Sequence, residues 1–334
     1  MVPEKRLAEI IRQKPLSKKG NMFELSSFKI SRAKPDNHEP AAQKSLSDIL
    51  NPNDWAFLSY IFVVGLIVLI FHNRVPGWPL YIAAQAIIII ATLLVIRFFH
   101  QHTSNVLQMI RHWYPIFSFT FLYRQAGLYN HMVFQGYVDE FFYKIDIWMF
   151  GTNPNIWLYD RLNNFYFNEL IHLCYFSYYV LPAAFGVILY VTKDKEFYRT
   201  LFGISITFYF CYFLYILIPA AGPLDLRQGR FVDGGIMVQI MDWIYSEVEK
   251  PGAAFPSSHV AIALITLMYA YRLHRTVFWV FLPFIIGLIF STVYGFYHYV
   301  IDVIAGAGIA AGSYYLCNYL FDKYAKAKFP NHFP

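Results

Sequence analysis

Residues 277–321 read VFWVFLPFIIGLIFSTVYGFYHYVIDVIAGAGIAAGSYYLCNYLF, and they contain two long apolar stretches that meet at His298. Each stretch is about 20 residues long, which is the length that a helix needs to cross the hydrocarbon core of a bilayer. The junction carries His298 and Asp302, and ionisable residues at membrane depth are costly and usually functional. This stretch therefore predicts two transmembrane helices with a functional site where they meet.

The remaining sequence has the same apolar character. Of its 334 residues, 57% are hydrophobic, 20% are aromatic and only 14% are charged. This composition excludes an ordinary soluble domain. Further stretches that are long and apolar enough to cross a membrane, or nearly so, are residues 55–72, 80–99, 167–191, 201–219 and 256–273. The sequence therefore predicts an all-α fold, a polytopic bundle of transmembrane helices.

The distribution of Lys and Arg predicts how these helices are oriented. The positive-inside rule assigns every cluster of basic residues to the cytoplasm, which requires an even number of crossings between any two clusters. Only three crossings are evident between the N-terminal segment and residue 193, so we expect one more, at residues 113–134, and about eight spans in total. Arg124 near the middle of this segment is expensive at membrane depth, and the alternative is a segment that lies in the interface or dips in and returns. With eight spans, both termini are cytoplasmic and the His298 junction lies on the opposite face. The clusters are residues 1–53, 97–111, 193–199, 272–275 and 323–328.

The first sequence feature that suggests chemistry is Pro256-Ser-Ser-His259, at the start of an apolar helix. Serine is a preferred N-cap, and the first turn of a helix leaves backbone NH groups unpaired. These NH groups and the positive end of the helix dipole attract anions such as phosphate. His259 would donate a proton there. On its own, this short match also fits a capped helix with a surface histidine.

The second feature is Ser291-Thr-Val-Tyr-Gly-Phe-Tyr-His298-Tyr-Val-Ile-Asp302. His298 and Asp302 are four residues apart, which places both side chains on one face of a helix. The carboxylate would accept one imidazole NH, fix the tautomer and leave the second nitrogen reactive. The alternative is a polar pair that only helps two helices to pack. Two histidine-bearing helix starts on the same face favour a site.

These two stretches resemble the second and third signature motifs of the type 2 phosphatidic acid phosphatase and vanadium haloperoxidase superfamily, Pro-Ser-Gly-His and Ser-Arg-x5-His-x3-Asp. The resemblance covers about the last 130 residues and implies a six-helix phosphatase-like core. It also implies a two-step phosphoryl transfer without a metal or other cofactor. His298 would attack phosphorus, Asp302 would orient it, and His259 would protonate the leaving oxygen.

The sequence departs from these motifs where the family has basic residues. Thr292 replaces the arginine of the third motif, and Ser258 replaces the glycine of the second. In the first motif, Lys-x6-Arg-Pro, only Pro223 is retained, and Tyr215 and Gly222 occupy the basic positions. The loss of three cations argues against a dianionic phosphomonoester and favours a phosphodiester, which carries one charge.

The pattern therefore resembles the branch that contains inositol phosphorylceramide synthase, which moves a phosphorylated head group from a phospholipid to a lipid alcohol. Asp146-x4-Gly151-x2-Pro154 and Ala220-Ala-Gly-Pro223 resemble that branch as well. The expected partners are a lipid phosphate or phosphodiester, possibly a lipid alcohol acceptor, and the bilayer. Alternatives are a phosphatidic acid-type phosphatase, a non-catalytic membrane protein with this fold, and a vanadate-dependent oxidase, whose relatives are soluble and keep the basic clamp.

Several residues are candidates for contacting the substrate. Basic side chains that could replace the clamp are Arg227, Arg230 and Lys250, and Arg124 if it is buried against Asp146 or Glu169. Tyr215 could still donate a hydrogen bond, and His172 could be a third histidine of the site, although a packing role fits it as well. The complete expected site consists of catalytic His259, His298 and Asp302 and substrate-binding Ser257, Ser258, Ser291, Tyr215, Arg227 and Arg230.

The chain divides into residues 1–53, a basic N-terminal tail, residues 54–322, a transmembrane catalytic domain, and residues 323–334, a C-terminal tail. The N-terminal tail lacks the interleaved aromatic residues and motifs of a nucleic-acid-binding segment. It is expected to set orientation and contact anionic lipid. Cys174, Cys211 and Cys317 fall inside apolar stretches and are expected to be packing residues.

Overall fold

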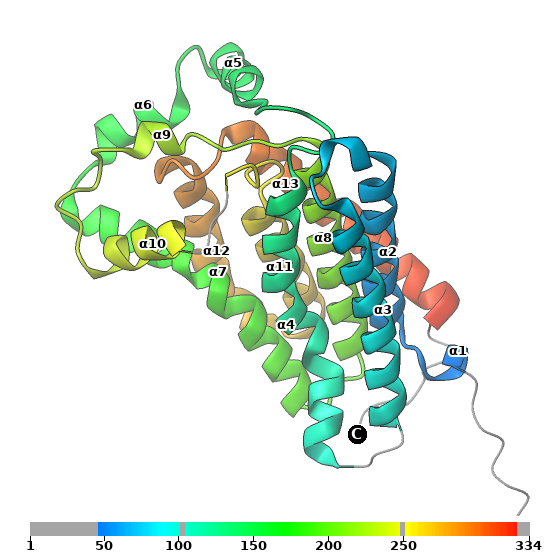
Figure 1. Cartoon of the computed structure of the whole chain (residues 1–334). Helices are drawn as coiled ribbons and strands as arrows, with labels where there is room; N and C mark the ends of the chain where they lie inside the picture. The colour runs from blue at the N-terminus through cyan, green and yellow to red at the C-terminus, as the bar shows by residue number, and fades with distance from the viewer. Residues whose placement is uncertain (1–45, 101–103, 248–250, 326–334) are drawn as a thin grey trace, which may run out of the picture. The chain divides into compact units, whose positions relative to one another are not determined.

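The computed structural model describes residues 46–100, 104–247 and 251–325 (Figure 1). In these ranges the regular elements are helices, and Ala220 and Ala253 form an isolated bridge. The predicted all-α fold is therefore confirmed. The helices are α1 Leu46–Ile49, α2 Pro52–Ile70, η1 His72–Arg74, α3 Trp78–His100, α4 Asn105–Tyr129, α5 Asp139–Phe150, α6 Pro154–Leu162, α7 Phe165–Val191, α8 Phe197–Leu217, α9 Leu224–Arg227, α10 Ile236–Glu247, α11 Ser258–Leu273, α12 Arg275–Tyr294, α13 Val300–Leu320 and a final π-helical turn η2 Phe321–Ala325.

Six helices in the described residues are long and apolar enough to cross a membrane, which supports a multi-pass membrane protein. The predicted segment 113–134 falls mostly in α4, a continuous helix of 25 residues that is less apolar than these six. Helix α11 is apolar but has only 16 residues. The count of eight spans and the orientation remain predictions, as do the two tails, most of which lie outside the described residues. The six spans are Pro52–Ile70, Trp78–His100, Phe165–Val191, Phe197–Leu217, Arg275–Tyr294 and Val300–Tyr324.

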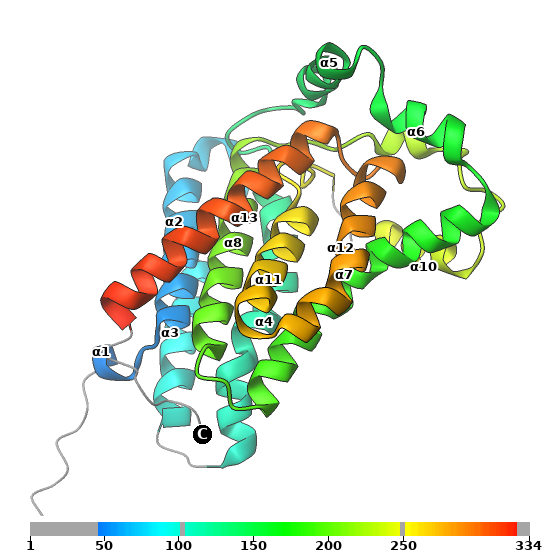
Figure 2. The same cartoon turned by 180° about the vertical axis from the view of Figure 1, so that it is seen from behind.

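Helix α11 lies at the centre of the bundle and contacts α7, α8, α12 and α13 (Figure 2). The side chains of α11 are almost all buried, from Ser258 to Ala270. The start of α11 approaches α13 closely at Gly306, where a Cβ atom would lie 2.4 Å from the carbonyl oxygen of Ser257. Glycine at this position lets the Pro-Ser-Ser-His segment lie against the first turns of α13.

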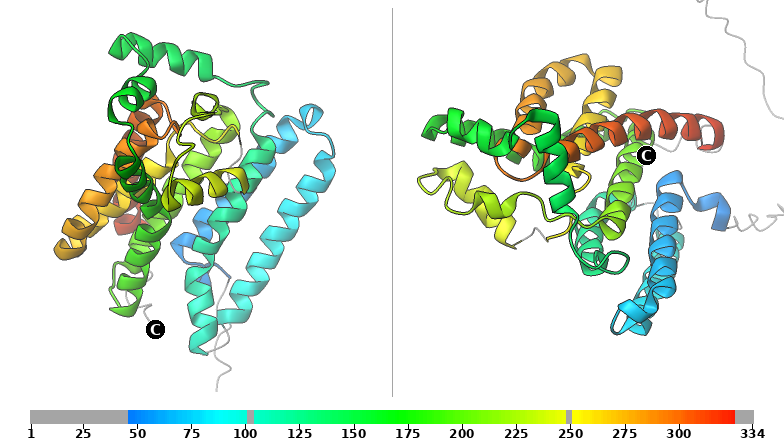
Figure 3. Two further views of the ribbon diagram at one scale, coloured as in Figure 1. Left: turned by 90° about the vertical axis from the view of Figure 1, so that its left-hand side faces the viewer. Right: turned by 90° about the horizontal axis from the view of Figure 1, so that it is seen from above.

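The N-terminal helices are attached to the outside of this bundle. Helices α2 and α4 pack on α8, and α3 packs mainly on α2, to one side of the other helices (Figure 3). A buried polar contact joins α2 to α4. Arg111 donates two hydrogen bonds to the carboxylate of Asp54, one of them at 2.8 Å, and the hydroxyl of Tyr114 donates a third at 2.7 Å. This contact fixes α4 beside α2.

Four short helices cover the end of the bundle at which α13 begins. Figures 1 and 2 both place α5 and α6 beyond this end, and α10 packs against α7. Asn153 caps α6 and Asn164 caps α7, each by accepting a hydrogen bond from the backbone NH three residues later. Helices α5 and α6 therefore lie over the junction that carries His298 (Figures 1 and 2).

Candidate active site

His298 lies in the loop between α12 and α13, and both its backbone NH and its backbone carbonyl are hydrogen-bonded. The NH of His298 donates to the carbonyl of Thr292 at 2.9 Å. The side-chain amide of Asn155, from α6, donates to the carbonyl oxygens of Val293 at 2.7 Å and His298 at 3.0 Å. Asn155 is fully buried. One amide from α6 therefore ties the loop that carries His298 to the end of α12.

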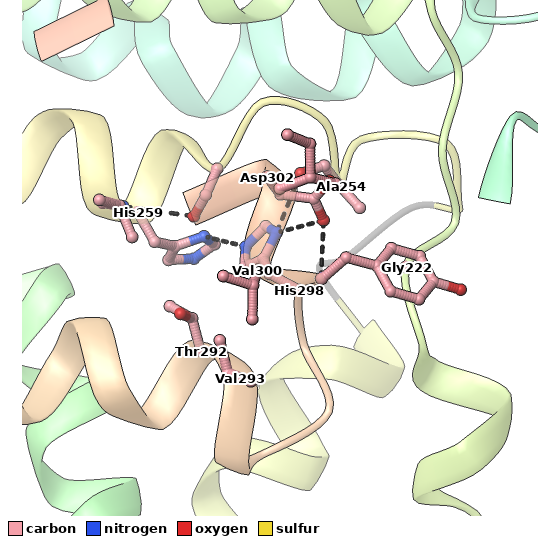
Figure 4. Close-up of polar contacts among 12 residues, drawn as sticks. Gly222, Ala254, His259, Thr292, Val293, His298, Val300 and Asp302 are labelled. Atoms are coloured by element: carbon pink, nitrogen blue, oxygen red, sulfur yellow. Dashed lines mark hydrogen bonds and ion pairs between the residues drawn. The ribbon is translucent and has the colours of Figure 1, made fainter. Parts of the chain in front are cut away.

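Two oxygen acceptors lie beside Nδ1 of His298 (Figure 4). The carbonyl oxygen of Ala254 is 2.9 Å away, and Oδ2 of Asp302 is 3.5 Å away. Because both neighbours can only accept a hydrogen bond, Nδ1 carries the proton and Nε2 has the free electron pair. The predicted pairing with Asp302 is present, but the carbonyl of Ala254 is the nearer acceptor.

The free Nε2 of His298 faces the second histidine. Nδ1 of His259 lies 3.4 Å from it, so the two imidazoles are within one hydrogen bond of each other (Figure 4). His259 is only 7% exposed, and its Nε2 is buried without a hydrogen-bond partner. A buried nitrogen without a partner is costly, which is typical of a group kept for a ligand or reaction.

Hydrogen bonds at the N-termini of α11 and α13 join these two helices beside the histidines. The hydroxyl oxygen of Ser257 accepts from the NH of Val260 at 3.4 Å, as expected for an N-cap. The NH of Ser257 donates to the carbonyl of Asp302 at 3.0 Å, and Oδ2 of Asp302 accepts from the NH of Tyr299 at 2.9 Å. The start of α11 and the start of α13 therefore form one hydrogen-bonded unit around the histidines.

Two carboxylates outside the predicted site hold the surrounding loops. Asp146 of α5 accepts hydrogen bonds from the NH groups of Val300 and Ile301, at 2.8 and 3.1 Å, and so caps α13. Asp139 accepts from the NH groups of Ala221 and Gly222, at 2.8 and 2.7 Å. Burial raises the pKa of both carboxyls above the ordinary value, and the bonds from backbone NH groups oppose this rise.

The sequence of the chain matches the model of one protein family. The family is described as the PAP2 superfamily, and its model matches residues 149–316, which is half of the chain and includes α6 to α13 up to Leu316. The chain belongs to the PAP2 superfamily. No curated protein and no solved structure matches the chain significantly. Members of the PAP2 superfamily are phosphatases or phosphotransferases, and their phosphate-ester chemistry agrees with the paired histidines.

Gly222, at the position where the resemblance predicts the arginine of the first motif, has no room for a longer side chain. Gly222 has a φ of +78° and lies so close to the site that a Cβ atom would be 2.8 Å from the carbonyl oxygen of Tyr297. The same atom would be 3.1 Å from Cβ of Ala254. The loop before α9 therefore packs directly on Tyr297 and Ala254, beside His298, and a longer side chain at residue 222 would collide with them.

The predicted substrate-binding serines occupy different environments. Ser258 lines a hollow beside His259, whereas the hydroxyl of Ser291 donates back to the carbonyl of Leu288 at 2.6 Å. Thr292, in place of the arginine of the third motif, likewise donates to its own helix, to the carbonyl of Ile289 at 2.7 Å. Ser291 and Thr292 therefore stabilise α12 in this structure.

Tyr215, which replaces the lysine of the first motif, lies in α8 and is buried. Its ring packs near the rings of Tyr123 and Tyr212, with centroids 6.4 and 5.9 Å apart. Tyr212 lines the hollow beside His259 together with Ser258. A role of Tyr215 at the substrate remains a prediction.

Arg227 is close to the catalytic loop and has several protein partners. It donates to the carbonyl of Gly295 at 2.8 Å and to the carboxylate of Asp242 at 2.6 Å. It also donates to Nε2 of His172 at 3.2 Å, since Nδ1 of His172 is bonded to a backbone carbonyl. The guanidinium carbon lies 4.8 Å from the ring centre of Tyr297. His172 thus orients Arg227, which in turn supports the loop before His298.

The other proposed cations are less closely connected to the histidines. Arg230 donates to the carbonyl of Leu226 and lies over the ring of Phe296, 4.9 Å from its centre. Lys250 lies outside the described residues. Arg124 is exposed on α4, so the expectation of a buried partner is wrong. Its suggested partners accept from backbone NH groups instead, Asp146 at the start of α13 and Glu169 at Met237 and Val238.

The sequence interpretation did not identify Asn155, Asp139 or the carbonyl of Ala254 as parts of the site. The carbonyl could not be found, because a main-chain acceptor has no residue signature. Asn155 directly follows the Asp146-x4-Gly151-x2-Pro154 segment, which was singled out only for its resemblance. This segment was the signal that the sequence offered. Asp146 within it caps α13, and Asn155 directly after it holds the loop that carries His298.

Proposed function

We propose that this PAP2 protein transfers a phosphorylated head group from a membrane phospholipid to a lipid alcohol, as the inositol phosphorylceramide synthase branch does. The observation that carries the proposal is the buried pair of His298 and His259, with Thr292, Tyr215 and Gly222 at the three basic positions of the motifs. A phosphodiester has one negative charge and needs fewer cations than a phosphomonoester. The predicted orientation places this chemistry on the non-cytoplasmic face.

In the first step, Nε2 of His298 attacks phosphorus, and the bond between phosphorus and the leaving lipid oxygen breaks. The proton on Nδ1 of His298 is held by Ala254 and Asp302, so the ring becomes a stable phosphohistidine cation. His259 takes part in this step as the protonated, charged imidazolium: it gives one proton to the leaving oxygen and becomes neutral, and the oxygen departs as diacylglycerol if the donor is a glycerophospholipid.

In the second step, the hydroxyl of the acceptor attacks phosphorus and the bond from phosphorus to Nε2 breaks. His259, which lost its proton in the first step, takes the proton of this hydroxyl. The two steps restore both histidines. The acceptor receives the phosphate with its head group, and no cofactor is consumed.

Substrate binding requires the two histidines to separate. In-line transfer places phosphorus about 3 Å from the nucleophile and the leaving oxygen about 3 Å from the acid, so the nitrogens need well over 5 Å. They are 3.4 Å apart in this structure. The hollow beside His259 gives that ring space in which to turn.

Reconstitution with defined lipids tests the proposal. The purified protein is incubated with phosphatidylinositol and ceramide, with phosphatidylinositol and diacylglycerol, or with phosphatidic acid alone, and the products are identified by mass spectrometry. A new lipid that carries the phosphorylated head group and depends on the acceptor supports transfer. Inorganic phosphate from phosphatidic acid, without any transfer product, identifies a phosphomonoesterase and contradicts the charge argument.

A further inference from the structure

We infer that a cleft between α4 and α7 binds one hydrocarbon chain of the phosphorylated lipid and that Gly186 leaves room for the far end of this chain. The inference rests on the proposed function, because it takes the head group of the same lipid to lie at His259. One wall of the cleft is formed by α4, which precedes the residues matched by the family model. The cleft therefore adds selectivity from a part of the chain outside the PAP2 core.

The cleft is bordered by three helices. Helix α8 forms its floor, through Tyr212, Phe208, Ile204 and Leu201, while α4 and α7 form its sides. Figure 1 shows α4 and α7 diverging towards the end of the bundle where α11 begins. Along α7 the lining runs from Tyr178 to Leu189.

The dimensions fit one chain. The eleven rises from Tyr178 to Leu189 correspond to about 16 Å at 1.5 Å each. This length is close to the depth of one leaflet, half of a hydrocarbon core of about 30 Å. The volume is about 220 Å³. This is less than the ~300–1,000 Å³ of pockets for compact drug-sized ligands. A space that is long but small in volume is narrow, which suits a single extended chain.

The cleft is continuous with the reaction centre. Ser258 and His259 line its upper end, where the ring of Tyr178 lies 4.2 Å from that of His259, centre to centre. Nε2 of His259 is buried and without a hydrogen-bond partner there, so a polar ligand group at this end would satisfy it. Below this level the lining becomes mainly apolar, through Pro182, Ala183 and Leu189. A lipid phosphate with its chain in the cleft matches both environments.

Gly186 lies where α7 approaches α4. A Cβ atom at this position would lie 3.4 Å from the ring of Trp113 and 4.0 Å from Ile116, both on α4. These are ordinary contact distances, so alanine fits there. The additional carbons of leucine would extend between α4 and α7 and fill the lower half of the cleft.

Photo-crosslinking tests this assignment. The probe is phosphatidylinositol with a diazirine at the end of one long acyl chain, bound to the full chain in detergent and mapped by peptide mass spectrometry. We expect labelling of residues 113–120 and 197–204, reduced about tenfold by Gly186→Leu and less by Gly186→Ala. Gly308→Leu is the matched control, because Gly308 lies on an exposed face of α13 with no atom within 4 Å of its Cβ position.

Two results would overturn the inference. One is equal labelling of the Gly186→Leu and wild-type proteins, and the other is labelling confined to the separate groove lined by Trp55 and Phe213. Head-group transfer is measured on the same samples with short-chain and long-chain phosphatidylinositol, and Gly186→Leu should impair only the long-chain reaction. Expected labelling without any transfer refutes the proposed function and leaves the cleft, whereas transfer with unchanged labelling refutes the cleft.

Discussion

Replacing Asn155 by Asp tests how much the side-chain amide of Asn155 contributes to holding the loop that carries His298. The substitution keeps the shape of the side chain but exchanges the NH₂ group for an oxygen, which faces the carbonyl oxygens of Val293 and His298. Both carbonyls lose the donor that now lies 2.7 and 3.0 Å away. Each unsatisfied buried carbonyl costs about 1–3 kcal/mol, so the loop loses roughly 2–6 kcal/mol. A displacement of about 1 Å at a reacting group can lower the rate about 100-fold.

Head-group transfer and thermal unfolding are measured for Asn155→Asp and for Asn153→Asp as the control. Asn153 lies two residues earlier and caps α6 by accepting from the NH of Ile156 at 3.1 Å, a bond that Asp also makes. We expect the control to remain active and Asn155→Asp to lose about two orders of magnitude in turnover. Equal activity of the two variants would refute the role assigned to Asn155.

Three other substitutions have distinct expected outcomes in the same assays. Gly222→Arg should lower activity rather than restore phosphomonoesterase activity, because its Cβ would lie 2.8 Å from the carbonyl oxygen of Tyr297; a gain of activity on phosphatidic acid would contradict the crowding. Ser258→Gly should retain activity at a cost in stability of about 1 kcal/mol or less, since Ser257 caps the helix. Asp302→Asn should lower turnover by less than the ~10⁴-fold known for a histidine that loses its orienting carboxylate, because Ala254 still accepts from Nδ1.

The helices and the histidines were predictable from the sequence because each depends on local patterns. Apolar stretches of membrane-spanning length define the long helices, and the motif spacing identifies His298 and Asp302 as neighbours. The motifs also place His259 at the start of a helix, where the structure confirms it in α11. Cys174, Cys211 and Cys317 are all buried and free, which agrees with the packing role predicted for them.

The contacts that position the site were not predictable, because they join segments far apart in the sequence. Asn155 reaches His298 across 143 residues, and Asp146 reaches Val300 across 154. The pairing suggested for Arg124 was wrong for a related reason. The sequence shows that Asp146 is acidic but not which groups its side chain contacts. Its partners are two backbone NH groups at the start of α13. The sequence showed that the basic residues are missing, but only the structure shows that Gly222 is packed too closely for a longer side chain.

Trapping the covalent intermediate tests the central claim most directly. The wild-type protein and His298→Ala are mixed with phosphatidylinositol labelled at phosphorus, quenched within one turnover, digested and searched for phosphorylated peptides. The account predicts an acid-labile adduct on His298 of the wild-type protein, which carries the inositol head group and disappears when ceramide is added. His298→Ala should form neither adduct nor product. Labelling of another residue, or turnover by His298→Ala, would contradict the account.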